Sequence, residues 1–493
     1  MNAPIVTQTH LGLNRRHFLL ATGGALALPW FVPEAWAAAS SERRIRPMGP
    51  GSKYVPRIRA AFVRRKGEYG LRWPGAVFDG EATRRDYTVQ MRLAEKELGL
   101  SIDLRPEPIY SAAEADAWLA EAKAAQPDGL LLMVWDRQEH AWPTALKAAE
   151  TGLPLVIFSP VGTAFTTNTA PLAERPGVCL CSTNDFGQAR LGLKMIRASA
   201  RIREMRYLVI QGAQRRDTVL PFFGTKLRHL PASTFLEEYR ATPDTDEIKA
   251  LAAEYLKHAQ RIVHATKQDL LNGIKSFVVA RTLLEREEAD AITMDCLGAL
   301  GNTKVSLPCI AWSKMLDQGI PAACEADLNA SITHALVQFL FDRPGFQQDP
   351  VPETARDCLI GAHCSCPTRL HGLEQPPFPY DITHHHGARD AVPRTQWRPG
   401  ERITVVEVVL PKPRAGTDPA PAAAPQMVIS TGTVVENVAV PPSGGCVVSV
   451  MVKLDGAPYL LTYPGFHQLF VCGNFKKELL DYCKLFGIQP LVA

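Results

Sequence analysis

The chain has 493 residues, of which 46% are hydrophobic and 21% are charged, and its formal net charge is +4. This length allows two or three domains with a large core, and the composition is that of an ordinary globular protein. A charge of +4 is too small to indicate a nucleic-acid partner, and no basic stripe is interleaved with aromatic residues. Beyond the N-terminal region, no stretch is long and apolar enough to span a bilayer.

The first 37 residues have the three parts of a secretory signal. Arg15 and Arg16 precede an apolar run over 18–32, and an A-x-A cleavage site ends at Ala37. An arginine pair directly before such a run is typical of the twin-arginine pathway. Glycine and proline interrupt the run, which favours cleavage over a retained membrane anchor. We therefore expect a periplasmic or otherwise exported protein that starts near Ala38 and has no stable membrane insertion.

Strands and helices alternate after a flexible segment at 38–56. The pattern predicts, in chain order, a strand at 58–63, a helix at 82–98, a strand at 102–109, a helix at 112–125, a strand at 129–135, a helix at 142–151 and a strand at 153–159. Ser111 and Glu114 predict a capping box at the start of the second helix. This alternation is typical of βαβ units, so we expect an α/β domain over 57–175.

A second run of the same kind follows. It predicts strands at 178–182, 207–211 and 289–295, and helices at 186–201, 233–238, 245–263 and 267–286. The last of these strands would deliver Asp295 at its carboxyl end, where open α/β sheets place their sites. We expect a second α/β domain over 176–356, which carries the acidic residues of a metal site.

The pattern changes near residue 357, because strands follow one another without helices between them. They are predicted at 358–362, 402–410, 426–433, 447–454 and 468–472, with a Pro/Ala-rich loop at 412–425 and a final helix at 475–486. We expect a β-rich domain over 357–493. The predicted fold class is α/β, with two N-terminal Rossmann-like α/β domains followed by a C-terminal antiparallel β-barrel-like domain.

The chain contains 11 cysteines. Most lie in apolar, strand-like contexts, where we expect buried thiols that act as small hydrophobic side chains; these are Cys179, Cys181, Cys296, Cys309, Cys324 and Cys472. Cys364 and Cys366 are too close together for ordinary zinc-knuckle spacing, and no second pair complements them.

Acidic and imidazole side chains occur at four places where strands end or helices begin. These are Asp295, the pair Glu325 and Asp327 before a predicted helix at 328–341, His363 and His467. Carboxylates and imidazoles from separate segments are the expected ligands of a Mn²⁺, Zn²⁺ or Fe²⁺ site. The alternatives are a helix cap for Asp327, structural roles for the histidines and a buried ion pair for Asp295.

Four segments resemble those of the L-fucose isomerase/L-arabinose isomerase superfamily. The segment 317–328, DQGIPAACEADL, is similar to its metal-binding segment, and 360–363, IGAH, resembles its strand-end histidine motif. The segment 399–405, PGERITV, is similar to its barrel strand, and 465–488, from GFH to LFGI, resembles its C-terminal signature.

The resemblance implies roles for the candidate residues. Asp327 and His467 would be metal ligands, and Glu325 would be a ligand or an acid/base group. Asp295, which stands where the family uses a glutamate, would be the second catalytic carboxylate. The residues that would bind substrate are His363, His384, His385 and His386.

The function implied is aldose–ketose isomerisation through a metal-stabilised enediolate, with Mn²⁺ as the expected cofactor and Glu325 as the proton carrier. A monosaccharide or oligosaccharide would be the substrate, and the chain would form a homo-trimer or homo-hexamer. Two alternatives stay open because sugar catabolism is cytoplasmic and this chain has an export signal. One is an exported metal-dependent enzyme that cleaves glycosides or modifies sugars on the same fold. The other is a non-catalytic sugar-binding protein.

Overall fold

The computed structural model describes residues 49–67, 79–137, 140–385, 390–411, 423–439 and 446–493. The predicted export signal at 1–37 and most of the loop at 412–425 lie outside these residues. Within the described part of the chain, no helix combines the length and the apolar character that crossing a membrane requires.

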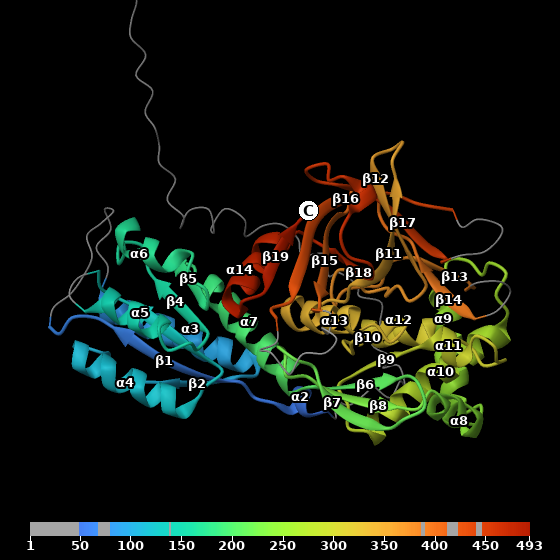
Figure 1. Ribbon diagram of the computed structural model, residues 1–493, viewed down its shortest axis with the longest axis horizontal. Coiled ribbons are helices and arrows are strands. Elements are labelled where there is room, and N and C mark those ends of the chain that lie inside the picture. Colours follow the sequence, from blue (N-terminus) through green and yellow to red (C-terminus); the bar gives the residue numbers. More distant parts are fainter. Residues whose placement is uncertain (1–48, 68–78, 138–139, 386–389, 412–422, 440–445) are drawn as a thin grey trace, which may run out of the picture. The chain divides into compact units, whose positions relative to one another are not determined.

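The first sheet has five parallel strands in the order β2-β1-β3-β4-β5 (Figure 1). Every residue of β3 and β4 is buried, as expected for parallel strands that are covered on both faces. The strands are β1 (Arg57–Val63), β2 (Ser101–Leu104), β3 (Gly129–Val134), β4 (Leu155–Ser159) and β5 (Val178–Ser182). The helices that accompany them are α3 (Gly80–Leu98), α4 (Ala112–Ala125), α5 (Ala141–Ala149), α6 (Thr166–Ala173) and α7 (Gly187–Glu204).

The second sheet has the order β10-β9-β6-β8-β7, and its edge strand β7 is antiparallel to β8 while the other pairs are parallel. Its strands are β6 (Arg206–Ile210), β7 (Arg216–Val219), β8 (Lys226–Leu230), β9 (Ala291–Met294) and β10 (Ala322–Cys324). The helices around it are α8 (Ser233–Ala241), α9 (Asp246–His258), α10 (Lys267–Arg286), α11 (Cys296–Leu300), α12 (Cys309–Asp317) and α13 (Leu328–Phe341).

The third sheet closes into an antiparallel barrel, because β15 pairs with both β18 and β16. Around the barrel the order is β15-β18-β11-β12-β17-β16, and β19 (Gln489–Val492) adds to β16 in parallel. The barrel strands are β11 (Phe346–Glu353), β12 (Cys358–His363), β15 (Arg402–Val409), β16 (Gln426–Asn437), β17 (Val448–Leu454) and β18 (Gln468–Cys472). A separate hairpin consists of β13 (Tyr380–His384) and β14 (Ala391–Thr395), and α14 (Lys476–Phe486) follows β18.

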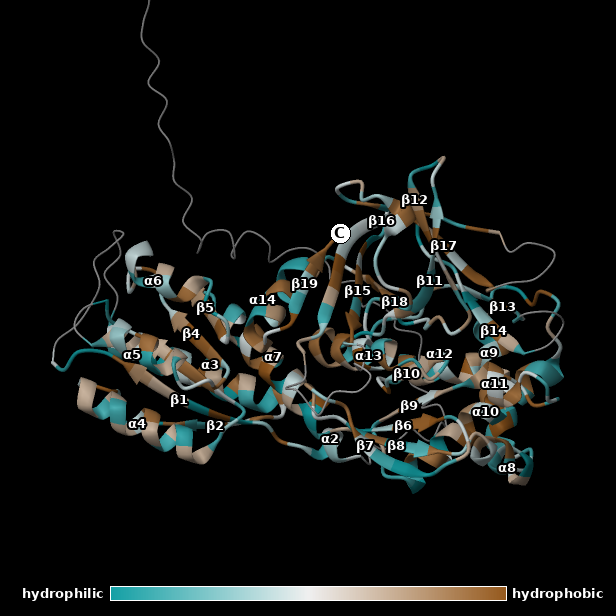
Figure 2. Cartoon of the chain, viewed as in Figure 1, coloured by the Kyte–Doolittle hydropathy of each residue, from teal (hydrophilic) through white to brown (hydrophobic). Residues whose placement is uncertain are grey.

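Hydrophobic residues are frequent on the strands of the sheets, although the edge strand β7 is hydrophilic, and the helices carry both apolar and polar residues (Figure 2). Aromatic rings fill part of the barrel core, where Phe346, Trp397 and Phe470 are almost fully buried and lie edge-on or tilted to one another. Such pairs stabilise a core beyond the area that they bury.

The mixed α/β class, the parallel sheets and the antiparallel barrel are confirmed. The finer domain boundaries at 175/176 and 356/357 stay predictions. β5 at 178–182 follows the first boundary but pairs with the first sheet, and β11 at 346–353 precedes the second boundary but pairs with the barrel. The strand predicted at 102–109 is shorter. It ends at Leu104, before Pro106 and Pro108, which have no N–H group to donate to a sheet.

Part of the segment predicted as flexible at 38–56 is anchored. Its described portion contains a single helical turn, α2 (Pro50–Lys53), which contacts α7. The buried carboxylate of Asp290 accepts hydrogen bonds from the backbone N–H groups of Gly51 and Ser52 at 3.0 and 2.8 Å. Residues 49–53 are therefore fixed to the second sheet.

Replacing Gly361 with alanine is expected to lower the free energy of unfolding by about 1–3 kcal/mol, the usual cost of overpacking a core. A methyl group at this position of β12 would lie 2.5 Å from Cε2 of Phe470 and 2.9 Å from Cγ of Gln348. Urea unfolding followed by circular dichroism measures the change. Ala362→Ser, at the neighbouring half-buried position, serves as the control and should alter stability by less than about 0.5 kcal/mol. Equal stability of the two variants would contradict the packing argument.

Candidate functional site

A strained turn connects β10 to α13 and presents the acidic pair. Glu325 and Ala326 have φ angles of 64° and 52°, in the left-handed region that non-glycine residues rarely occupy. The turn is held by the N–H group of Ala326, which donates to the carbonyl of Met294 at the end of β9. Backbone strain of this kind costs about 1–3 kcal/mol and occurs mostly at functional sites.

Asp327 has two roles at the start of α13. Its Oδ1 accepts a hydrogen bond from the N–H group of Ala330 at 3.0 Å, which caps the helix. Its Oδ2 accepts a hydrogen bond from Nδ1 of His467 at 2.8 Å. The bond fixes the orientation of the imidazole ring, so that Nε2 points away from Asp327.

Nε2 of His467 faces two further carboxylates. It lies 3.1 Å from Oδ1 of Asp349 on β11 and 3.5 Å from Oε2 of Glu325. Nε2 and this Asp349 oxygen are both buried and neither has a hydrogen bond of good geometry. Buried polar atoms are normally satisfied, and a cation between these two atoms would satisfy both.

His363, the last residue of β12, completes a set of ligands. Its Nε2 lies 3.9 Å from Oε1 of Glu325, and its ring centroid lies 5.6 Å from that of His467. One ligand atom from each of Glu325, His363 and His467 lies within 4.8 Å of the others. We call the five residues Glu325, Asp327, Asp349, His363 and His467 the carboxylate–histidine site.

The electrostatics of the carboxylate–histidine site favour a bound positive charge. Burial lowers the pKa of His467, but its contacts with Asp327 and Asp349 outweigh burial and raise the pKa to about 10. Burial, together with the nearby carboxylates Asp349, Asp327 and Asp295, raises the pKa of Glu325 against the opposing effect of His467. The carboxylates that hold a proton on this imidazole would equally attract a metal cation, which would take the place of the proton on Nε2.

A buried glutamate positions the segment that carries His467. Oε2 of Glu407 on β15 accepts a hydrogen bond from the N–H group of Phe466 at 2.9 Å. Gly465 has a φ of 87°, and a Cβ atom there would lie 2.1 Å from the same carboxylate oxygen. Glycine is therefore required at position 465 on both grounds. The ring of Phe466 is exposed, with its centroid 4.5 Å from that of His467.

The other predicted site residues that the structure describes lie outside the carboxylate–histidine site. Asp295 caps the short helix α11 by accepting from the N–H group of Gly298, and it is outside the set of converging ligand atoms. His384 pairs with Asp269 at 2.9 Å, whereas His385 lies with Cys309 and Cys364. His386 lies outside the described residues.

Sequence analysis missed Asp349 and Glu407. Asp349 lies on β11, whose sequence FQQDPVPE includes two prolines and has no alternation of apolar residues. Glu407 interrupts the apolar run of β15, and a buried charge in a strand is the one signal that could have identified it.

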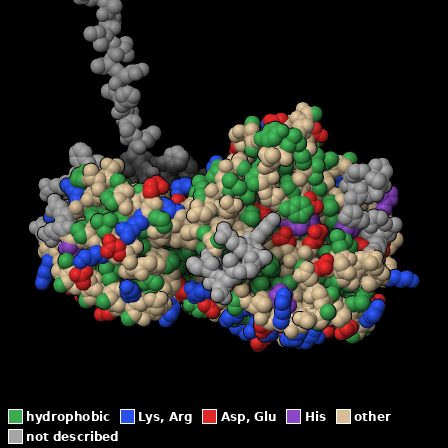
Figure 3. All heavy atoms as spheres, viewed as in Figure 1, with side chains coloured by type: hydrophobic (Ala, Val, Ile, Leu, Met, Phe, Trp, Pro, Cys, Tyr) green, Lys and Arg blue, Asp and Glu red, His purple; other side chains and the backbone are tan. Residues whose placement is uncertain are grey.

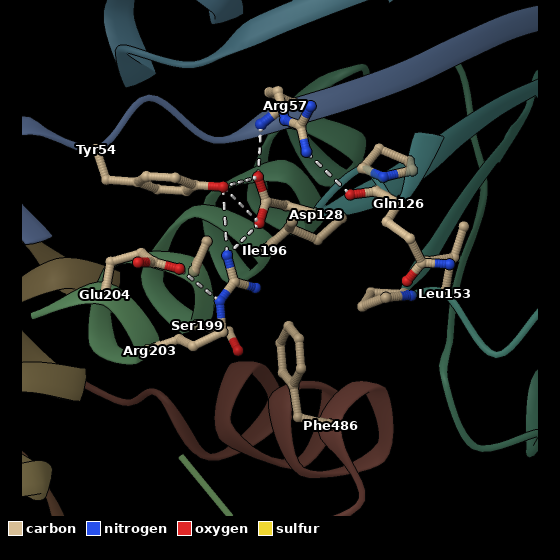
Figure 4. A pocket seen from close by; sticks show the side chains of 13 residues that line it. Tyr54, Arg57, Gln126, Asp128, Leu153, Ile196, Ser199, Arg203, Glu204 and Phe486 are labelled. Atoms are coloured by element: carbon tan, nitrogen blue, oxygen red, sulfur yellow. Dashed lines mark hydrogen bonds and ion pairs between the residues drawn. The ribbon is translucent and has the colours of Figure 1, made fainter. Parts of the chain in front are cut away.

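Two hollows differ in chemistry. The larger hollow has a volume of about 510 Å³. Its polar lining residues Tyr54, Asp128 and Arg203 form hydrogen bonds with one another, so these three side chains already have partners within the protein (Figure 4). The smaller is about 30 Å³, enough for an ion or a water molecule, and is lined by Glu325 and His363 together with several cysteines. Acidic and histidine side chains also gather on the face of the molecule seen in Figure 3. The smaller hollow therefore adjoins the carboxylate–histidine site, which contributes Glu325 and His363 to its lining.

Comparison with known proteins returned no matching family model and no matching curated protein. Among solved structures, the molecule XylFII matches at 11% identity with a TM-score of 0.18, over 49% of this chain and 79% of its own. GanP, a glucose-galactose binding protein from Geobacillus stearothermophilus, matches at 13% identity and a TM-score of 0.18, over 58% and 90%. A sugar-binding protein of a Bacillus halodurans sugar ABC transporter matches at 16% and 0.16, over 61% and 91%.

These matches correct the sequence-based resemblance. The solved structures named are sugar-binding proteins rather than sugar isomerases. The assignment to the fucose/arabinose isomerase superfamily is therefore wrong, and so are the isomerase activity and the enzyme class expected from it. These matches give no support to manganese, and the divalent cation stays a prediction from the ligand types. The matches show neither a family nor a role for this chain, so a function has to be argued from the geometry of the carboxylate–histidine site.

Proposed function

We propose that this chain is an exported, non-catalytic carbohydrate-binding protein in which a divalent cation at the carboxylate–histidine site coordinates sugar hydroxyl groups. The observation that carries the proposal is the convergence of Glu325, His363 and His467 within 4.8 Å of one another. The signal pattern around Arg15 and Arg16 supports export.

The chemistry of the ligands supports a divalent cation. One carboxylate and two imidazoles are donors that suit zinc and first-row transition ions, and Asp349 offers a further oxygen. Asp327 would act on the cation through His467, since it holds Nδ1 and leaves Nε2 for the cation. Binding would satisfy the buried Nε2 atom and balance the surrounding carboxylates.

The size of the hollow supports a sugar that binds at its rim. The hollow beside Glu325 and His363 has a volume of about 30 Å³, which has no room for a monosaccharide. Glu325 and Asp349 remain partly accessible, with side chains 38% and 31% exposed. A sugar could thus approach from solvent and supply hydroxyl oxygens to open coordination positions of the cation.

Phe466 supports carbohydrate over a simple anion or metal as the ligand. Its side chain is 57% exposed although it adjoins two buried residues, Glu407 and His467. Small-molecule sites combine apolar or aromatic surfaces with a few polar groups that fix orientation. An aromatic face beside a cation offers both kinds of contact to the C–H and O–H groups of a sugar ring.

The proposal is tested by titrating the full chain with a panel of monosaccharides in a calorimeter, with added Mn²⁺, Zn²⁺ or Co²⁺ and after removal of metal with EDTA. Sugar binding is expected with the cation and is expected to disappear without it. Phe466→Ala should weaken sugar binding about 5- to 10-fold, the loss of roughly 1 kcal/mol of apolar contact, and leave cation binding unchanged.

Phe165→Ala is the matched control, because Phe165 is similarly exposed but adjoins α6 of the first sheet. It should bind sugar as the unaltered chain does. Sugar binding that persists in EDTA, or that is equally strong in the two phenylalanine variants, would contradict the proposal.

A further inference from the structure

A second cluster of metal-ligating side chains lies beside the carboxylate–histidine site. Ligand atoms of Cys309, Cys364 and His385 lie within 4.8 Å of one another, and all three residues are buried. Cys446 interacts with Cys364 and lines the same small hollow as these three residues. We call Cys309, Cys364, Cys446 and His385 the soft-ligand cluster.

Four separate segments build the soft-ligand cluster. Cys309 is the first residue of α12, Cys364 directly follows β12, His385 directly follows β13, and Cys446 precedes β17. The backbone of His385 is fixed, since its N–H group donates to the carbonyl of Asp390 at 2.8 Å.

The donor set specifies the kind of ion. Three sulfurs and one imidazole nitrogen match the Cys₃His set of tetrahedral zinc sites, in which Zn–S bonds of about 2.3 Å put neighbouring ligands about 3.8 Å apart. The ligand atoms of Cys309, Cys364 and His385 are up to 4.8 Å apart, about 1 Å more than this, so a small contraction around an ion, with the thiol of Cys446 brought in as the fourth ligand, would complete the tetrahedron.

We propose that the soft-ligand cluster is a second metal site, which binds zinc or a similarly thiophilic ion with Cys309, Cys364, Cys446 and His385 as ligands. It is separate from the site proposed for carbohydrate binding, because its donors are thiols rather than carboxylates. The two sites border one small hollow, which the ion of the soft-ligand cluster would occupy, while the cation of the carboxylate–histidine site would lie beside it, between Glu325, His363 and His467.

The position of the cluster gives the ion a structural role. Cys364 and Cys446 belong to the barrel, while Cys309 begins a helix beside the second sheet. A shared ion would tie these parts of the chain together. It would also fix Cys364, and through it the adjacent His363, which ends β12 in the carboxylate–histidine site.

Zinc itself is the probe for the experiment. The full chain is purified under reducing conditions, loaded with Zn²⁺ and dialysed against a mild chelator, and the retained zinc is measured by mass spectrometry. One equivalent per chain is expected to remain. Co²⁺ loaded in place of zinc should give the visible spectrum of a tetrahedral ion and thiolate-to-cobalt charge-transfer absorption.

Cys364→Ser and Cys446→Ser are each expected to weaken zinc retention at least about 100-fold and to remove the charge-transfer absorption. Cys446 is only partly buried, so its replacement tests the site even if Cys364→Ser does not fold. Cys358→Ser, at the other end of β12, is the matched control and should retain zinc. Equal retention in Cys446→Ser and the unaltered chain, a cobalt spectrum without charge-transfer absorption, or a Cys364–Cys446 disulfide in the metal-loaded protein would overturn the proposal.

Discussion

Replacing Asp290 with alanine is expected to lower the free energy of unfolding by about 3–5 kcal/mol. Its carboxylate is 4% exposed and accepts four hydrogen bonds, from the N–H groups of Gly51, Ser52 and Arg206 at 3.0, 2.8 and 2.9 Å and from the hydroxyl of Ser52 at 2.6 Å. Hydrogen bonds to a charged group contribute about 1.5–3 kcal/mol each, although they are not additive. Alanine would leave buried donors without a partner, which is the costlier outcome.

The change is measured by urea unfolding of the full chain. Asp103→Ala is the control, because its carboxylate is largely exposed and its ion pair with Arg59 is 3.8 Å long. The control should change stability by less than about 0.5 kcal/mol. Limited proteolysis between residues 49 and 56 should accelerate in Asp290→Ala and not in the control. A loss below about 1 kcal/mol would show that this carboxylate does not hold the segment at 49–53 in place.

Regular elements with strong local signals could be predicted from the sequence. The helices at 112–125 and 267–286 have the expected bounds, and so do the strands at 178–182 and 468–472. In the helix at 112–125, Ser111 accepts from the N–H group of Glu114, but the predicted capping box is incomplete, because the carboxylate of Glu114 accepts from the N–H group of Tyr110 instead. Such elements are determined by local periodicity and end signals, which a single sequence contains.

Elements that depend on distant partners could not be predicted. β7 has the polar sequence RDTV and is a strand because β8 pairs with it. β11 contains two prolines and pairs with β12 and β18, its neighbours in the barrel. In the closed barrel, β11 forms backbone hydrogen bonds with a strand on each side, and these stabilise an extended conformation that its own residues do not favour. The site residue Asp349 was missed for the same reason.

Residues of the candidate site that lie at the ends of strands could be predicted from the sequence. Residues that tertiary packing brings to the site could not. Glu325, His363 and His467 lie at segment ends and do converge, whereas His384 is paired with Asp269 elsewhere. The tight spacing of Cys364 and Cys366 excludes an ordinary zinc knuckle. The fold nevertheless brings Cys364 to Cys309, Cys446 and His385, which are 55, 82 and 21 residues away in the sequence. Such distances leave no local pattern.

Replacing Asp327 with asparagine is expected to weaken cation binding at the carboxylate–histidine site about 10- to 100-fold without a loss of stability. Asparagine caps helices as well as aspartate does, so the bond to the N–H group of Ala330 can persist. The negative charge of the Asp327 carboxylate, which faces Nδ1 of His467, disappears, however. That carboxylate is the partner that orients the imidazole ring and raises its basicity. Groups that orient a metal-bound histidine affect affinity by this factor.

Two further variants separate the roles of Asp327. Asp327→Ala removes the cap as well and should lower the free energy of unfolding by about 1 kcal/mol, whereas Asp327→Asn should stay within about 0.5 kcal/mol of the unaltered chain. His467→Gln removes the ligand itself and should weaken cation binding more than Asp327→Asn does. Calorimetric titration with Zn²⁺ of chain already loaded at the soft-ligand cluster measures each affinity. If Asp327→Asn binds the cation as tightly as the unaltered chain, Asp327 is a helix cap alone and the imidazole is held for the cation by other contacts.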